Sequence, residues 1–166
     1  MITVAWNERS VEQARLLNPA FLGTLLWSGA KGYASVANEN QPYLISFLVP
    51  PIVLHKSTRE RLPRTIRTSL VAWLGDNASV HVGFGDRATA LVPLVKEAIL
   101  FASNTGMIQL QDARVVAARK PSGMAEMMSG TSSEVNACIM RARFVGKWFA
   151  RSGDYRTVMA LWGVAP

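Results

Sequence analysis

The sequence predicts a mainly α-helical domain with one small β-hairpin, so the expected fold class is α+β. Apolar residues recur at i, i+3 and i+4 in several segments, and capping residues mark the ends of those segments. One segment, 107–117, changes to the alternation that is typical of strands. The 166 residues fit a single domain, 1–166, and the 49% that are hydrophobic can supply its core.

The first predicted helix begins at Asn18 and Pro19. The Asn18 side chain can cap the free N–H groups of the first turn, and proline at the first helical position loses no hydrogen bond. We expect this helix to end at Gly32. Its apolar face carries Leu22, Leu25, Leu26 and Gly29.

The apolar run 43–54 fits a buried helix or a buried strand by periodicity alone. The pair Pro50-Pro51 argues against a central strand, because proline lacks the N–H that pairs strands, so we predict a helix with a kink near Val49. The following stretch, 56–63, is predicted to be a basic turn. A short helix over 65–74 is then expected to bury Ile66, Leu70, Trp73 and Leu74.

A long helix is predicted to start at Asp86, whose side chain can cap it, and to stop at Gly106. Pro93 predicts either a kink in this helix or a later start of its regular part. The apolar face of this long helix carries Ala88, Leu91, Val92, Val95, Ile99 and Ala102.

Segment 107–117 predicts a β-hairpin with its turn at Asp112-Ala113.

Residues of about 120–131 are predicted to form a mobile loop, followed by a C-terminal helical segment, 132–166. Thr131-Ser132-Ser133-Glu134 has the pattern of a capping box, so the last long helix should begin there and end at Gly153. A short helix over 154–161 follows. The apolar stripe of the long helix carries Val135, Cys138, Ile139, Ala142, Val145 and Phe149.

The predicted order is helix, helix, helix, hairpin and helix. This order resembles a winged-helix domain with extra helices at its N- and C-terminal ends. Residues 1–17 are assigned to an N-terminal arm of the same single domain.

Positive charge is concentrated in two clusters, the first in segment 56–67 and the second in segment 141–156. The net charge is +7, from 18 Lys and Arg against 11 Asp and Glu, and clustered positive charge attracts polyanions or acidic protein surfaces. A solvated surface is the alternative. Trp148 and Trp162 are candidate partner contacts, and Trp162 with the C-terminal tail could instead pack onto the last long helix and complete the fold. The candidate nucleic-acid-binding or partner-binding residues are Lys56, Arg59, Arg61, Arg64, Arg67, Arg143, Lys147 and Arg151.

The sequence holds little that indicates catalysis. His55 and His81 lie in no zinc-binding spacing, and Cys138 falls on an apolar stripe, as a buried structural thiol does. Gly83-Phe84-Gly85 is not followed by the lysine of a phosphate-binding loop. We therefore expect a protein that is not an enzyme and has no cofactor or metal. A site assembled from distant residues stays an alternative.

The sequence also favours a cytoplasmic protein that does not act at a membrane. No apolar run reaches the about 18 residues that a membrane-spanning helix needs. Residues 1–15 mix acidic and basic side chains, unlike a signal or transit peptide. Cys138 is the only cysteine, which excludes an internal disulfide and fits a reducing compartment.

Three segments carry a resemblance that covers nearly the whole chain. They are Asn18-Pro19-Ala20-Phe21, the run from Leu48 to Lys56 with the pattern L-x-x-P-I-V-L-H-K, and the run from Leu161 to Pro166 with the pattern L-W-G-V-x-P. In these segments the chain resembles the middle component of bacterial three-component ABC systems. None of the three segments is a catalytic signature.

The resemblance implies a non-catalytic adaptor that works with an SMC-like ABC ATPase and an effector, frequently a nuclease. Such sets include the Lamassu-type anti-phage and anti-plasmid defence systems. The middle component would bridge or regulate the other two, and DNA would be reached through the complex. The basic clusters and the hairpin also fit a free-standing winged-helix DNA-binding regulator. An adaptor should co-purify with its ATPase, whereas a regulator should be a self-sufficient dimer with a specific operator.

Overall fold

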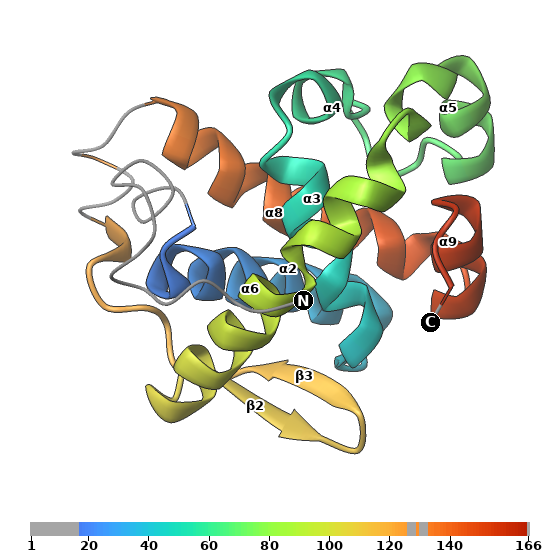
Figure 1. The fold of residues 1–166 in the computed structure, drawn as a ribbon. Helices are drawn as coiled ribbons and strands as arrows, with labels where there is room; N and C mark the ends of the chain where they lie inside the picture. The colour runs from blue at the N-terminus through green and yellow to red at the C-terminus, as the bar shows by residue number, and fades with distance from the viewer. Residues whose placement is uncertain (1–16, 126–128, 130–132, 166) are drawn as a thin grey trace.

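Residues 17–125, 129 and 133–165 are described by the computed structural model. Two long helices, α2 (Pro19–Ala37) and α8 (Ser133–Arg151), lie side by side, and a third, α6 (Phe84–Asn104), packs against α2 (Figure 1). The other elements are β1 (Gln41–Pro42), the 3₁₀ helix η2 (Tyr43–Phe47), α3 (Val49–Val53), α4 (Lys56–Arg61), α5 (Leu70–Asp76), the 3₁₀ helix η3 (Ala78–His81), β2 (Ile108–Gln111), β3 (Arg114–Ala117) and α9 (Tyr155–Leu161).

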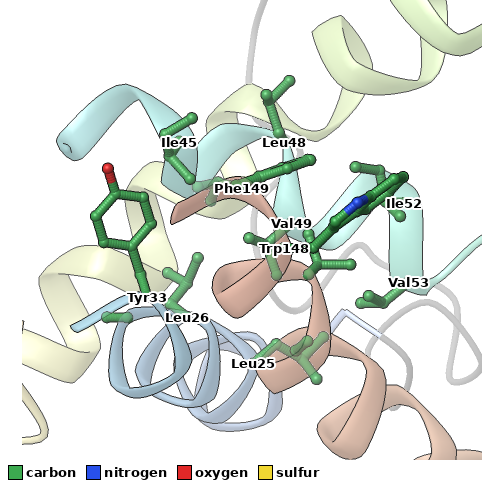
Figure 2. Packing of buried hydrophobic residues seen from close by; sticks show 14 of the residues in the cluster. Leu25, Leu26, Tyr33, Ile45, Leu48, Val49, Ile52, Val53, Trp148 and Phe149 are labelled. Carbon is green, nitrogen blue, oxygen red and sulfur yellow. The ribbon is translucent and has the colours of Figure 1, made fainter. Parts of the chain in front are cut away.

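The core lies where η2 and α3 pack against the two long helices. Figure 2 shows Leu26 and Tyr33 of α2 on one side of this core, with Phe149 of α8 between them and Leu48. Leu26 and Phe149 are fully buried, and Leu48 is 1% exposed. Since α3 contacts α2, α6 and α8, this short helix joins the three long ones.

Helix α2 begins as predicted but continues past Gly32 to Ala37. The Asn18 side chain accepts a hydrogen bond from the Ala20 N–H at 2.8 Å, and Pro19 occupies the first position. The prediction that Gly32 ends the helix is wrong, because Gly32 serves packing instead. A Cβ built there would overlap the backbone carbonyl oxygen of Arg143 in α8.

Glycines bring α2 and α8 into backbone contact. A Cβ on Gly146 would overlap the carbonyl oxygen of Gly29, and the Ser28 hydroxyl donates to the Ile139 carbonyl at 3.0 Å. The contact positions advance together along both helices, so the two helices run in the same direction (Figure 1). Small residues permit this close approach, which buries one full side of each helix.

The segment from Tyr43 to Leu74 is helical in shorter pieces than predicted. The apolar run is helical as expected and divides at Leu48, between η2 and α3. The stretch predicted to be a basic turn is instead helix α4, in which Thr58 and Arg59 are buried. Helix α5 begins at Leu70 rather than at residue 65, because the Ser69 hydroxyl caps it by accepting from the Ala72 N–H.

Helix α6 starts two residues before the predicted cap. Gly83 adopts the left-handed conformation at its N-terminus (φ 65°), and Asp86 lies in the first turn. The helix includes Pro93 and ends at Asn104, close to the predicted stop at Gly106 (φ 72°). Its buried face contains Ala88, Val95, Ile99 and Ala102, as predicted, whereas Leu91 and Val92 are half-buried.

The predicted β-hairpin is confirmed. Strands β2 and β3 pair antiparallel, with Leu110 opposite Val115, and the turn residues Asp112 and Ala113 both have positive φ, at 49° and 57°. The sequence pattern missed β1, which pairs with the other edge of β3 and makes the strand order β1-β3-β2. A two-residue strand that contains Pro42 has no detectable alternation, so only the fold reveals it.

At the C-terminal end, α8 buries the predicted stripe from Cys138 to Phe149, with Val135 half-buried. Asp154 caps α9 by accepting from the Arg156 N–H at 3.1 Å, and Gly153 has φ 100°. Residues 1–16 of the predicted N-terminal arm, the first two residues of the capping box and part of the predicted loop lie outside the described residues, which exclude 1–16, 126–128 and 130–132.

The α+β class is confirmed, with helices dominating and one small antiparallel sheet. The winged-helix arrangement stays a prediction. Among the described residues, no helix is long and apolar enough to cross a membrane.

Candidate functional site

Arg59 is separated from the exposed basic residues with which the sequence groups it. Its side chain is 5% exposed, its Nη1 donates to the Val53 carbonyl at 2.6 Å, and its Nη2 lies 2.7 Å from Oε1 of Glu134. The guanidinium therefore points inward and joins α4 to α8. This corrects its assignment to a binding surface, because a buried arginine with a carboxylate partner has a structural role.

Glu134 and Cys138 complete this contact. The hydrogen bond and the positive charge of Arg59 lower the pKa of Glu134, which therefore stays ionised to lower pH than an ordinary glutamate. The Cys138 sulfur lies 3.3 Å from Arg59 Nη1, and burial raises the pKa of its thiol. A buried thiol with a raised pKa is a poor nucleophile, in agreement with a structural Cys138.

Lys56 and Arg61 are the next members of the first predicted cluster. Lys56 is exposed and lies 4.0 Å from Glu60, a weak pair on the surface of α4. The Arg61 guanidinium donates to the Ser79 hydroxyl, and the Arg61 carbonyl accepts from Trp73 Nε1 at 3.1 Å. Arg61 is therefore exposed but held toward η3 and α5.

Residues 62–68 connect α4 to α5 and lie along α8; we call them the linker. Trp148 Nε1 donates to the Thr68 carbonyl at 2.7 Å, and Arg141 Nη1 donates to the Pro63 carbonyl at 3.4 Å. These bonds join the two ends of the linker to α8. Arg64 and Arg67, which lie between them in sequence, are exposed. The two basic segments of the sequence, far apart along the chain, therefore meet in the fold.

The second predicted cluster forms one stripe on α8. Arg143 and Arg151 are exposed and Lys147 is half-buried. Four-residue steps advance a helix by little more than one turn, so the three side chains stand on one face. Lys147 stands three residues after Phe144, and Arg151 stands three residues after Trp148. Lys147 and Arg151 therefore adjoin the side of α8 that contacts the linker, whereas Arg143 stands farther round the helix, where its backbone carbonyl meets Gly32 of α2.

These residues form what we call the basic surface. Arg141 belongs to it because it is half-exposed and links the linker to α8. Within the described part of the chain, none of its members has a carboxylate at ion-pair distance. The members are Arg64, Arg67, Arg141, Arg143, Lys147 and Arg151.

Trp148 and Trp162, the two candidate partner contacts, are buried in this chain's own core. Trp148 is fully buried and Trp162 is 1% exposed. The Trp162 ring lies 4.6 Å from Phe84, centroid to centroid, and 6.0 Å from His81, on which it stacks. For Trp162 the structure shows the alternative in which the ring completes the fold. The prediction that Trp148 contacts a partner is wrong, because its ring is fully buried in this chain.

His55 makes a local contact at the N-terminal end of α4. His55 Nδ1 lies 2.8 Å from the Thr58 hydroxyl, and burial together with the charge of Arg87 lowers the pKa of His55. Over residues 17–125, 129 and 133–165, no group of three His, Cys, Asp or Glu side chains could hold a metal ion.

An apolar groove opens between η2, α6 and the C-terminal end. Its volume is about 290 Å³. It is lined mainly by apolar side chains, and Lys96 also contributes to it. Those side chains include Tyr43, Phe47, Ala88, Val92, Met159 and Val164.

Comparison with protein families decides what kind of protein carries this surface. The family model described as "ABC-three component (ABC-3C) system Middle Component 3" matches residues 6–166. The chain belongs to this family. The expectation that the resemblance raised, a middle component of a three-component ABC system, is thereby confirmed at the level of the family.

No curated protein and no solved structure matches this middle component. Its membership in the family therefore rests on the family model, and the arrangement of its functional surfaces rests on the geometry described above.

Arg141 is the residue of this middle component's basic surface that was missing from the predicted site. It precedes Arg143 in the basic segment, but it stands on a different side of the helix, next to Phe144. A helical projection of α8 would have separated Arg141 from the stripe, although it could not have placed Pro63 against it. That contact depends on the fold.

Proposed function

We propose that this middle component is a non-catalytic adaptor that bridges or regulates an SMC-like ABC ATPase and an effector, with a nuclease as the expected effector. The proposed setting is a Lamassu-type defence system against phages or plasmids. The observation that carries the proposal is the family match over residues 6–166, since a middle component of a three-component system works with two further components.

The structure supports this proposal through the roles of its chemistry-bearing side chains. Cys138 is buried beside Arg59, and His55 lies at the N-terminal end of α4, where its ring contacts Thr58. These residues stabilise the fold, which fits a protein that acts through its surfaces. Nucleotide hydrolysis would then belong to the ATPase.

Co-expression with the ATPase and effector encoded beside this chain tests the adaptor role. We expect an affinity-tagged middle component to retain each protein separately and both together, and effector activity to lose its control by the ATPase when the middle component is omitted. Retention of neither protein would contradict the proposal. A stable dimer that binds one specific operator would favour the free-standing regulator instead.

Calorimetry tests the non-catalytic part of the proposal. Titration of the purified chain with ATP and magnesium should give no heat of binding, because the Gly83-Phe84-Gly85 stretch at the start of α6 lacks the lysine of a phosphate loop. The same titration of the ATPase serves as the positive control. Micromolar binding of ATP by the isolated middle component would contradict the proposal that nucleotide chemistry belongs to the ATPase.

A further inference from the structure

The basic surface combines two segments that the fold brings together. Trp148 and Arg141 of α8 donate to the two ends of the linker. Arg151 of the stripe stands three residues after Trp148 on a neighbouring part of the helix surface. The result is an extended surface and not a pocket. Its shape therefore suits a long ligand that contacts several cations at once.

The cations of this surface repel one another within the part of the chain that the structure describes. No described carboxylate pairs with its members. Arg143, Lys147 and Arg151 stand at i, i+4 and i+8, and like charges four residues apart destabilise a helix by about 0.2–0.5 kcal/mol per pair. The helix dipole favours Arg151 in the last turn, and a negative ligand would remove the remaining repulsion along the stripe.

The side-chain types favour phosphate. Five of the six members are arginines, whose planar guanidinium forks match the oxygens of a phosphate group. The three residues of the stripe are spaced by about 6 Å along the helix axis, since each residue rises about 1.5 Å. A double helix of nucleic acid presents phosphates continuously along such a length.

Other polyanions fit the surface less well. Single strands are held by bases that stack on exposed aromatic rings, but Trp148 is buried and the Phe144 ring is covered by the Arg141 guanidinium, 5.5 Å from its centroid. Protein interfaces centre on exposed apolar and aromatic side chains. Among the described residues of α8, Met140, at 57%, is the one exposed large apolar side chain.

We propose that the basic surface binds the phosphate backbone of a nucleic-acid duplex without reading its sequence. Arg64 and Arg67 contact phosphates from the linker, and Arg143, Lys147 and Arg151 contact them from α8. Arg141 holds the two parts together by its bond to Pro63. The proposal concerns the free chain, so it does not depend on the adaptor role.

Fluorescence anisotropy with a short mixed-sequence DNA duplex tests this proposal over a series of salt concentrations. The stripe variant combines Arg143→Gln, Lys147→Gln and Arg151→Gln, and the linker variant combines Arg64→Gln and Arg67→Gln. The matched control removes the same charge as the stripe variant at exposed positions of α6 and beyond β3. It combines Lys96→Gln, Arg119→Gln and Lys120→Gln.

We expect the stripe variant to bind at least roughly tenfold more weakly and to lower the salt slope by up to about 2.7, at about 0.9 per lost contact. The linker variant should lower the slope by up to about 1.8 on the same basis. The control should keep the slope of the wild type. Losses in both test variants would establish that the two segments form one binding surface.

Four results would overturn the proposal. The wild-type chain could fail to bind duplex even at low salt, or the control could lose as much affinity as the stripe variant. A single-stranded oligonucleotide could bind more tightly than the duplex. Polyglutamate could compete as well as DNA at equal charge, which would instead identify the acidic surface of a protein. A parallel titration with an RNA duplex distinguishes the two sources of the same phosphate backbone.

Discussion

On the side of α8 that faces α2, Gly146 brings the two backbones into contact and Phe149 is fully buried. On the adjoining outer side, the side chains of Arg143 and Arg151 are exposed and have no described ion-pair partner. One helix therefore carries a side on which added volume is not tolerated and a side that presents charged side chains to solvent. The difference separates the residues that pack α8 against α2 from the exposed residues of the proposed binding surface, and substitutions on the two sides should have opposite consequences.

The largest effect is expected at Trp162, which follows α9 and packs its ring against Phe149 of α8. Its ring is 1% exposed and lies among Phe84, Trp73 and Phe149. Trp162→Ala should lower the free energy of unfolding by about 3–5 kcal/mol, because it leaves a large cavity. Urea denaturation of the full chain measures this loss.

Val71→Ala is the control for Trp162, because Val71 is 62% exposed on α5. Its effect should stay within about 0.5 kcal/mol. If Trp162→Ala unfolds at the same urea concentration as the wild type, the C-terminal end contributes nothing to the core and is free for a partner.

The second effect separates a glycine that packs from one that does not. Gly146→Ala should destabilise the chain by about 1–3 kcal/mol, since its methyl group would overlap the Gly29 carbonyl oxygen. Gly85→Ala should instead stabilise it by up to about 1 kcal/mol, because alanine favours the helix and nothing lies within 4 Å of the new Cβ. Thermal unfolding of both variants checks the opposite signs. Stabilisation by Gly146→Ala would show that α2 and α8 are farther apart than described.

The comparison also explains which features could be predicted from the sequence. Local signals were sufficient for the Asn18 cap and for the Asp112-Ala113 turn, because each depends on residues within a few positions. Gly32 was misread as a helix end, since the reason for its glycine is the Arg143 carbonyl in another helix. Long-range contacts of this kind leave no periodic trace.

The candidate site shows the same limit. The sequence located the exposed arginines of both segments, but it could not separate Arg59 from them, because the burial of Arg59 depends on Glu134, 75 positions later. Nor could it decide between a core and a partner for Trp162, since a buried aromatic and an interface anchor have the same side chain. The contact between the linker and α8 could not be predicted from the sequence, because it joins residues far apart along the chain.

The third effect is smaller and depends on pH. The pKa of Glu134 is lowered in the folded protein, so its bond with Arg59 contributes stability above the ordinary glutamate pKa and loses it as pH falls through the folded pKa. Glu134→Gln should therefore lower Tm at neutral pH. Because the Glu134 side chain is 58% exposed, water screens the pair and the loss should be modest.

Melting curves over a pH series test this assignment, with Glu60→Gln as the matched surface control, since Glu60 makes only a weak pair with Lys56. The difference between wild type and Glu134→Gln should shrink in acid, once Glu134 is protonated. A difference that stays constant with pH would mean that the charge of Glu134 does not act on Arg59.

The smallest effect is expected on the exposed side of α8 and has the opposite sign. Replacing Arg143, Lys147 and Arg151 by glutamine removes two like-charge pairs at i, i+4, each worth about 0.2–0.5 kcal/mol. Glutamine is also a good helix former, and the replaced side chains have no described ion-pair partner to lose. The stripe variant should therefore melt at the temperature of the wild type or slightly above it, while it binds duplex more weakly. A clear loss of stability would show that the stripe packs against another part of this chain. The stripe would then be a structural feature and not a free surface, which would contradict the binding proposal.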